Sequence, residues 1–511
     1  MFIASATATV FSALQTAEVL PTLTAYAGKK FEFEKKYACG VCRAVLDGEP
    51  CEKFDSCHLI HAQSVRPSCE DAGFCAVPAP YDADAAPLPN AAAFPDIRVT
   101  PVFGTKDYNQ VRISAITSAE RPATWDTAKS AEIFDYNEVF RYKWTKNKLH
   151  TKLIRVTPGN DTYAIGNVSV PITLPAQGDG VSGVIFADPC VKGASITADV
   201  ACTYASKFKT LTRTPALLNV LAPATDFWGI LGDNFYDKTG KVTGVMFDKI
   251  SFEAKSKLMV TVPGNHDYWV LGGPDAGTKS DQYANGHMQW YAQDAKSAQY
   301  VGTGNKSAPF DFSSDPSTHH PLRGGNLPAI TNAFHYHQIG NLGVVGYSGA
   351  YTLAETKPYM KEACAWLGAQ QGMDVAMIVG HWDTDGLGCD KTMAGPMFYE
   401  EMKVLPGCDA LDKKNMLKFF MGHTHCNIPH PHGKVDTGFM VAGQGMGGCG
   451  NYGMPILDTT GGRIKVYHFG IVDKDGTDHY DDTMKCLESK GWRACTDLAE
   501  LWLDQALPAR N

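Results

Sequence analysis

Residues 232–236 (Gly-Asp-Asn-Phe-Tyr) directly follow the apolar run 227–231. An apolar run that ends in Gly-Asp predicts a buried parallel strand with a carboxylate at its C-terminal end. Asp233 has two oxygens that can bridge two cations, and Tyr236 is near enough in sequence to bind one of them. A phenolate is a hard anionic ligand that suits ferric iron better than zinc or magnesium. Alone, the segment is also compatible with ordinary turn chemistry.

Four further strand-like runs end in side chains that can bind a metal. The runs are residues 184–187, 258–262, 375–379 and 419–421. The side chains that follow them are Asp188, Asn265, His266, Asp267, His381, His423 and His425. Because ligands gather at the carboxyl ends of strands in an open α/β sheet, these runs predict one shared site.

Taken together and in this order, the motifs resemble the calcineurin-like metallophosphoesterases. The Gly-Asp-Asn-Phe-Tyr form is similar to the purple acid phosphatase branch, which includes the tartrate-resistant acid phosphatases. The resemblance covers roughly residues 180–475. It implies an α/β protein with a four-layer α/β/β/α sandwich.

The resemblance also implies a two-metal centre. One ion would be held by Asp188, Tyr236 and His425, the other by Asn265, His381 and His423, with Asp233 between them. In the family the tyrosine-bound ion is Fe(III), and its partner is a divalent ion such as iron, zinc or manganese. His266, beside Asn265, is the expected proton donor to the leaving group.

The implied activity is that of an acid phosphatase, which hydrolyses phosphate monoesters with a hydroxide that bridges the ions. Its substrate would be a phosphorylated small molecule or a phosphoprotein. One alternative is a phosphodiesterase that acts on nucleotides or phospholipid headgroups. Another is a secreted binding protein with a vestigial phosphatase domain.

The chain departs from the family pattern at two places. Purple acid phosphatases carry another histidine soon after the Gly-His motif, whereas this stretch has none here. Either Asp383 or Asp385 is a candidate substitute, and the alternative is that the second proton donor is absent. The first motif reads Asp188-Pro189-Cys190 in place of the familiar Asp-x-His or Asp-Trp-Gly.

Some of these residues also have structural interpretations. Asp188 before proline is compatible with a turn, and Tyr236 with a packed aromatic side chain whose hydroxyl finds a backbone partner. We expect His335 and His337 to lie on one face of a strand. The remaining histidine pairs are expected in loops, where either would line a substrate pocket: His319 with His320, and His430 with His432.

The N-terminal part of the chain predicts processing and export. Residues 1–27 form a candidate signal peptide with a small-x-small ending, although positive charge near Met1 is missing and a tail is the alternative. Residues 28–78 form a cysteine-rich module, in which the close pair Cys39 and Cys42 is compatible with a disulfide framework or with a zinc site. Residues 79–94 read as a linker.

The remaining domains follow from composition and alternation. Residues 95–178 alternate apolar and polar side chains, which predicts a small antiparallel β-rich domain, with strands at 111–115, 140–144 and 149–156. Residues 179–475 form the catalytic domain, within which 268–330 is a long polar excursion. Residues 476–511 form a C-terminal tail that ends in a helical apolar pattern at 498–507.

Cysteines and sequons point to an oxidising compartment. The chain has 15 cysteines, among which Cys486 and Cys495 are close enough in sequence to pair locally. The odd total leaves at least one cysteine either free or in an intermolecular bond, and Cys190 and Cys426 are the candidates beside expected ligands. Sequons begin at residues 160, 167 and 305. We expect a glycoprotein that is secreted or enters a lysosome-like endomembrane compartment.

Charge and hydropathy exclude two classes of partner. The net charge is −8 across 511 residues and no long basic cluster occurs, so nucleic acid is not an expected partner. No apolar stretch approaches about 18 residues, so no membrane span is expected.

Overall fold

The computed structural model describes the chain in segments. These are residues 31–35, 42–46, 49–50, 96–101, 108–118, 135–137, 147–165, 168–191, 202, 208–237, 241–267, 334–349, 351, 353–382, 394–432, 435–442, 449 and 451–509. Several sequence predictions lie outside them: the signal peptide, the linker, the strand at 140–144, the excursion 268–330, His319 and His320, and Asp383 and Asp385.

The chain divides into two compact units, Met1–Tyr81 and Asp82–Asn511. In the first unit, three strands form an antiparallel sheet in the order β1-β2-β3, with bounds β1 (Phe31–Lys35), β2 (Cys42–Leu46) and β3 (Glu49–Pro50). All remaining elements belong to the second unit.

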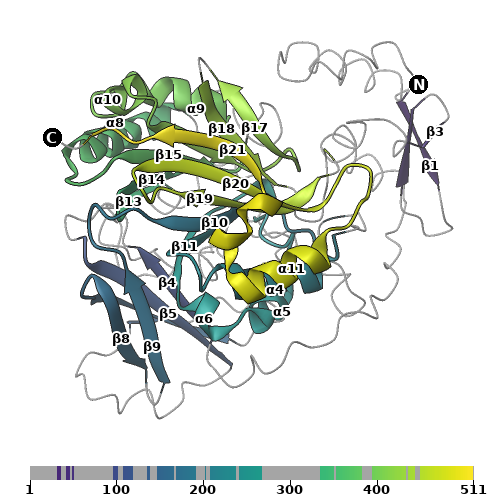
Figure 1. Ribbon diagram of the computed structural model, residues 1–511, viewed down its shortest axis with the longest axis horizontal. Helices are drawn as coiled ribbons and strands as arrows, with labels where there is room; N and C mark the ends of the chain where they lie inside the picture. Colours follow the sequence, from purple (N-terminus) through teal and green to yellow (C-terminus); the bar gives the residue numbers. More distant parts are fainter. Residues whose placement is uncertain are drawn as a thin grey trace, which may run out of the picture. The chain divides into compact units, whose positions relative to one another are not determined.

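Ten of the described strands of the second unit pair in one large mixed sheet, part of which is labelled in Figure 1. In spatial order they are β21 (Glu500–Ala506), β20 (Arg463–Val472), β19 (Tyr452–Asp458), β10 (Ser182–Phe186), β11 (Phe227–Leu231), β12 (Leu258–Val262), β4 (Asp96–Pro101), β5 (Gln110–Ser118), β7 (Asn147–Arg155) and β6 (Asp135–Asn137). At its centre β10, β11 and β12 run parallel, so their carboxyl ends lie at one edge.

A second mixed sheet has six described strands. In spatial order they are β13 (His335–Ile339), β14 (Leu342–Gly346), β15 (Val375–Gly380), β16 (Leu417–Met421), β18 (Val435–Val441) and β17 (Asn427–His432). Here β14, β15, β16 and β18 run parallel. A separate hairpin joins β8 (Gly159–Ile165) to β9 (Val168–Leu174).

The described helices form two groups on opposite sides of the paired sheets (Figure 1). One group contacts the six-stranded sheet and consists of α8 (Leu353–Ala369), α9 (Gly395–Met402) and α10 (Cys408–Lys413). The other consists of α4 (Thr210–Leu221), α5 (Lys241–Lys249), α6 (Phe252–Lys255) and α11 (Tyr480–Lys490), and it contacts the ten-stranded sheet through α5, α6 and α11. The second unit is therefore a mixed α/β structure with its two sheets between the two groups of helices.

Strand β11 shows how both faces of the ten-stranded sheet are covered. Phe227 and Leu231 belong to an apolar core that also contains residues of the six-stranded sheet. Trp228 points to the opposite face, where its Nε1 donates to the carbonyl of Ala254 in α6 at 3.1 Å and its ring packs on Phe247 of α5. Side chains alternate along a strand, so a strand covered on both faces is apolar throughout, as the sequence predicted.

The predicted β-rich segment joins the same sheet. Strands β4, β5 and β7 pair antiparallel, as the alternation of apolar and polar residues indicated. Strand β4 also pairs parallel with β12 at Val99 and Leu258, and Val111 lies in the shared apolar core. The predicted boundaries between the domains are not tested by these pairings and remain predictions.

The helical prediction for residues 498–507 is wrong. Residues 500–506 form strand β21, which pairs antiparallel with β20 at the edge of the ten-stranded sheet. Its anchor is Trp502, which stacks on His468 and Phe439. The apolar spacing was compatible with a helix, but pairing with β20 satisfies the backbone of this segment instead.

The disulfides confirm one expectation and correct another. Cys486 pairs with Cys495, as predicted from their closeness in sequence. Cys190 and Cys426 are not unpaired thiols, because Cys190 bonds to Cys202 and Cys426 to Cys449. A further disulfide joins α8 to α10 through Cys364 and Cys408.

Within the described segments, no helix combines the length and the apolar character needed to cross a lipid bilayer.

Candidate metal centre

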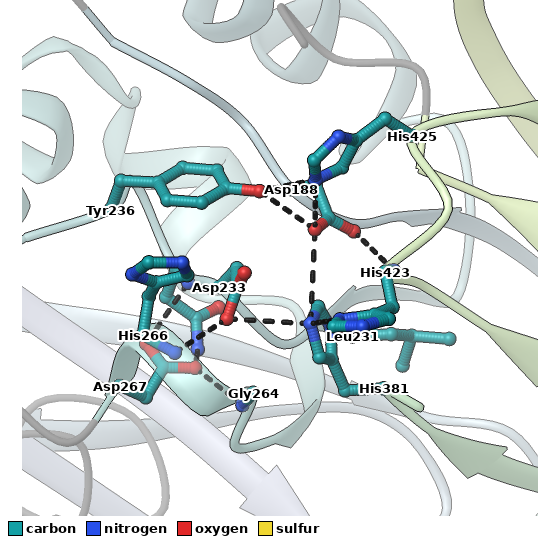
Figure 2. A network of polar contacts seen from close by, with 11 residues as sticks. Asp188, Leu231, Asp233, Tyr236, Gly264, His266, Asp267, His381, His423 and His425 are labelled. Atoms are coloured by element: carbon teal, nitrogen blue, oxygen red, sulfur yellow. Dashed lines mark hydrogen bonds and ion pairs between the residues drawn. The ribbon is translucent and has the colours of Figure 1, made fainter. Parts of the chain in front are cut away.

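The residues predicted to form one site lie at the carboxyl ends of five parallel strands, three in one sheet and two in the other. Asp188 follows β10, Asp233 and Tyr236 follow β11, and a 3₁₀ turn η6 (Asn265–Asp267) follows β12. From the second sheet, His381 follows β15 directly, while His423 and His425 follow β16. Figure 2 shows their side chains meeting where the two sheets face each other.

Tyr236, Asp188 and His425 form a first cluster. The Tyr236 hydroxyl donates to Asp188 Oδ1 at 2.9 Å and lies 2.8 Å from His425 Nε2. His425 Nε2 is 3.4 Å from the same carboxylate oxygen. All three side chains are buried, and the Tyr236 hydroxyl contacts side chains and not the backbone partner expected of a merely packed tyrosine.

Asp233, His381 and His423 form a second cluster. Their ligand atoms all lie within 4.8 Å of one another, and all three residues are buried. His381 Nε2 is 3.3 Å from Asp233 Oδ1 and 3.1 Å from His423 Nδ1. These are nitrogen and oxygen donors of the kind that bind divalent transition metals.

Asp188 connects the two clusters. Its Oδ1, which receives the Tyr236 hydroxyl, is 3.8 Å from His381 Nε2. Its Oδ2 accepts the backbone N–H of His423 at 2.9 Å. The two groups of donors are therefore neighbours, separated by one carboxylate (Figure 2).

The tautomer of His381 indicates what the second cluster can hold. His381 Nδ1 lies 3.0 Å from the carbonyl oxygen of Leu231, which can only accept, so in the neutral ring Nδ1 carries the hydrogen. Nε2 then presents a lone pair to the oxygen of Asp233 and to Nδ1 of His423. Converging lone pairs repel unless a proton or a cation lies among them, so the donor set fits a metal ion.

His423 adds a second sign of the same kind. Its other ring nitrogen, Nε2, is buried and has no hydrogen-bond partner in the described part of the chain. A buried polar atom without a partner is costly, and such atoms mark sites where an ion or a water completes the structure.

The electrostatics of the site are those of an anionic pocket. Burial raises the pKa of the Tyr236 phenol well above its ordinary value, and the charges of Asp188 and Asp233 raise it further. Burial acts to lower the pKa of His381, but the same carboxylates outweigh it and raise the pKa to about 10. Burial and the neighbouring His381 hold the pKa of His423 well below its ordinary value. A bound cation would replace these protons, because metal ligands must be deprotonated.

Backbone strain is concentrated at the site. Asp188, Asp233, Tyr236, His423 and His425 all adopt positive φ, between 49° and 78°. This left-handed region is disfavoured for residues with a Cβ, and it persists only where surrounding contacts hold it. The sharp turns aim the side chains back over the strand ends.

Glycines make room for the ligands. A Cβ on Gly422 would lie 2.7 Å from Asp188 Oδ2 and 2.8 Å from His381 Nδ1. A Cβ on Gly264 would lie 2.3 Å from Asp233 Oδ1. Glycine before these two donor motifs is therefore required by the close approach of the backbone to the donor side chains, as the sequence indicated, whereas a Cβ on Gly380 would meet Tyr347 and Met421 instead.

Asp267 has a role that sequence reasoning missed. Its carboxylate accepts the N–H of Gly264 at 2.6 Å and the side-chain amide of Asn234 at 3.0 Å. It thus fastens the loop after β12 to the loop after β11, which carries Asp233. Its place in the Gly-Asn-His-Asp motif was the available signal.

His266 lies beside the clusters. It is half-buried, whereas His381, His423 and His425 are buried. Its ring centroid is 5.0 Å from that of Tyr236. The backbone of Asn265 is in η6, and its side chain is outside what the structure describes.

The histidines outside the site partly match expectation. His335 and His337 stack on each other in the buried strand β13, as predicted for one face of a strand. His430 and His432 are not in a loop but in strand β17, which pairs with β18.

Comparisons with known proteins give structural similarity at low sequence identity. No protein-family model matches the chain, and no curated protein matches it. A purple acid phosphatase isolated from yellow lupin (Lupinus luteus) seeds is similar with a TM-score of 0.43 and 11% identity, over 75% of this chain and 73% of that one. PhoD is similar with a TM-score of 0.37 and 10% identity, over 75% and 88%. A dimetal phosphatase from Danio rerio is similar with a TM-score of 0.30 and 11% identity, over 57% and 96%.

Proposed function

We propose that the protein is a binuclear metal-dependent phosphohydrolase. The observation that carries this proposal is the pair of adjacent buried donor clusters joined by Asp188, with ring nitrogens and carboxylate oxygens turned toward one another. A single structural ion would not need two donor groups, and a vestigial site would not need to retain them.

The two clusters would hold different ions. Tyr236, Asp188 and His425 offer a phenol oxygen, a carboxylate oxygen and an imidazole nitrogen, and this set suits a strongly Lewis-acidic ion such as Fe(III). The cluster of Asp233, His381 and His423 suits a divalent ion such as iron, zinc or manganese. The motif also assigns Asn265 to the second ion and Asp233 to a bridging position.

Two bound cations clamp a phosphoryl group and acidify water into a nucleophile at working pH. The residues of the chain supply the rest. The buried aspartates balance the charge of the ions, and the Leu231 carbonyl fixes the orientation of the His381 ring. His266 is the proposed proton donor to the leaving oxygen, because it is the half-buried imidazole at the site and hence the one open to a substrate.

We further propose that the substrates are phosphate monoesters and that the protein works in an oxidising compartment. Tyr236 favours the monoesterase, because diesterase branches of the superfamily that the motifs resemble usually lack this tyrosine. The described disulfides favour export, because such bonds persist outside the cytosol.

The visible absorption spectrum tests the proposal, with metal content measured on the same purified sample. We expect two ions per chain and a phenolate-to-iron charge-transfer band that disappears in Tyr236→Phe. Tyr359→Phe, which replaces a tyrosine on α8, is the matched control and should leave the band unchanged. A protein that binds no metal after careful preparation would overturn the proposal.

Substrate class is tested separately. We expect p-nitrophenyl phosphate to be hydrolysed faster than bis(p-nitrophenyl) phosphate, with His266→Ala slowing the reaction about 10²- to 10⁴-fold. The opposite preference would assign the site to phosphodiesters while leaving the two-metal centre in place.

A further inference from the structure

Two disulfides each include a cysteine that lies within two residues of an expected metal ligand. Cys190 follows Asp188 by two residues and is bonded to Cys202. Cys426 follows His425 directly and is bonded to Cys449. Both ligands belong to the first cluster, the one that contains Tyr236.

Both of these ligand residues have a backbone that needs support. The φ angle is 54° at Asp188 and 57° at His425, in the left-handed region that residues with a Cβ disfavour. Such conformations persist where the surrounding structure holds them. A covalent crosslink within two residues is one such support, because it removes freedom from the turn that carries the ligand.

The bond between Cys426 and Cys449 also crosses between the sheets. Cys426 follows strand β16 of the six-stranded sheet, and Cys449 precedes strand β19 of the ten-stranded sheet. Beside the disulfide, the N–H of Asn427 donates to Asn451 Oδ1 at 3.3 Å. His425 contacts Asp188 and Tyr236, which follow strands of the ten-stranded sheet. This crosslink therefore lies where donor side chains from the two sheets meet.

Two residues of the second cluster are held by hydrogen bonds instead, while the third, His423, lies on the same turn as His425. His381 is oriented by the carbonyl of Leu231, and Asp233 Oδ1 accepts the N–H of His266 at 2.8 Å. No described disulfide adjoins either residue. The donors within two residues of a disulfide therefore both belong to the first cluster.

We infer that the Cys190–Cys202 and Cys426–Cys449 disulfides position Asp188 and His425 of the first metal subsite, so that this subsite depends on the oxidised state of the protein more than the second does. The inference rests on the proposed two-metal function. It makes the cysteines positioning residues, which act through Asp188 and His425 and do not touch the ions.

Paired substitutions test the inference on the full chain. The test variant is Cys426→Ser with Cys449→Ser, and the second is Cys190→Ser with Cys202→Ser. The matched control is Cys486→Ser with Cys495→Ser, which removes a disulfide of similar loop length to Cys190–Cys202 (sequence separations 9 and 12) from α11 and its following turn. Ions per chain are measured by atomic emission, and folding by far-ultraviolet circular dichroism.

We expect the wild type and the control to bind two ions. Each test variant should retain one ion and bind the other about 10- to 100-fold more weakly, and the iron–phenolate band should weaken with it. A disulfide with only a structural role would lower the melting temperature without changing the number of ions bound per chain or their affinity. Two ions with unchanged affinity in both test variants would overturn the inference. A wild type that binds no ions would instead overturn the proposed function.

A native-state measurement covers the case in which the variants do not fold. A trialkylphosphine cleaves the S–S bond to two thiols, with two electrons from phosphorus and with the oxygen and two protons from water, giving the phosphine oxide. Cys449 is half-buried and Cys426 is buried, so attack is expected at Cys449. We expect one ion to be released from the metal-loaded wild type as Cys426 and Cys449 become open to alkylation. Complete alkylation of both with two ions retained would contradict the inference.

Discussion

Asp233 and Asp267 lie in neighbouring loops, and each accepts a hydrogen bond from the backbone N–H of the residue beside the other. Oδ1 of Asp233 accepts the backbone N–H of His266 at 2.8 Å, and Oδ1 of Asp267 accepts the backbone N–H of Asn234 at 2.9 Å. Each carboxylate therefore holds the residue next to the other. This reciprocal arrangement fixes the loops after β11 and β12 against each other, and with them the proposed metal ligand Asp233 and the proposed proton donor His266.

Substitution of Asp267 should weaken this connection. Asp267→Asn replaces an acceptor oxygen with an NH₂ group and leaves at least one of three buried donors without a partner. We expect the free energy of unfolding to fall by about 1–3 kcal/mol, measured by urea denaturation. Asp504→Asn, which removes an exposed pairing with Arg463, is the control and should change stability by less than about 1 kcal/mol. Equal effects of the two substitutions would contradict the role of Asp267.

A methyl group at Gly422 should disrupt the site. Its Cβ would lie 2.7 Å from Asp188 Oδ2 and 2.8 Å from the carbonyl oxygen of Leu231, so the ligands would have to shift. We expect Gly422→Ala to lower phosphatase activity about 100-fold, because misplacement by about 1 Å has that effect on catalysis. Gly470→Ala is the matched control, since its nearest neighbour lies at an ordinary 3.7 Å, and it should retain activity. Full activity in Gly422→Ala would show that the loop relaxes without moving Asp188 or His381.

His468 should make stability depend on pH. Burial lowers its pKa from 6.5 to about 4, against a smaller opposing effect of Asp473, and Glu500 Oε2 lies 4.0 Å from its Nδ1. The unfolded chain therefore binds a proton below pH 6.5 that the folded chain does not bind until about pH 4. The free energy of unfolding is therefore unaffected by His468 above pH 6.5, and it is reduced by about 3 kcal/mol when the pH falls to 4.

The substitution His468→Phe tests this assignment. Phenylalanine keeps a ring that can stack on Trp502 and removes the titrating nitrogen. Between pH 7 and pH 4, the unfolding free energy of the wild type should fall by about 3 kcal/mol more than that of the variant. Parallel curves of stability against pH would show that His468 does not titrate differently in the two states.

Removal of metal should destabilise the protein. An ion that binds the folded chain alone contributes about 2.7 kcal/mol when its concentration is 100 times its Kd. We expect a chelator to lower the melting temperature of the wild type, and added Mn²⁺ or Zn²⁺ to restore it. His381→Ala removes a nitrogen of the second cluster and should reduce the response to added ion. A melting temperature that does not change with chelator or with added ions would contradict a metal centre at these residues.

Local sequence was sufficient to predict the strands that carry the site. Residues 227–231, 258–262 and 375–380 are apolar runs buried along their whole length, and each ends near a glycine and a donor side chain. Burial on both faces removes the polar alternation, and the sharp stop marks the carboxyl end of the strand. That pattern lies within about ten residues of chain, so it can be recognised without knowing what lies next to it.

Pairings between distant segments could not be predicted in the same way. From the sequence, Cys426 was a candidate unpaired thiol, whereas the structure bonds it to Cys449. Residues 500–506 were expected to be helical, whereas they pair with β20 as a strand. A disulfide or an edge strand depends on which surface is nearby, and one sequence is compatible with several partners.

The sequence by itself determined which side chains of this protein could bind metal and that they follow parallel strands. The family resemblance implied how these donors group, but only the tertiary structure decided their contacts: Tyr236 and His425 meet at Asp188, and Asp233 lies with His381 and His423. The physical reason is that donor identity is a property of single residues. Which lone pairs converge depends on two sheets packing together, and the contacts that join them link residues as far apart as Tyr236 and His425.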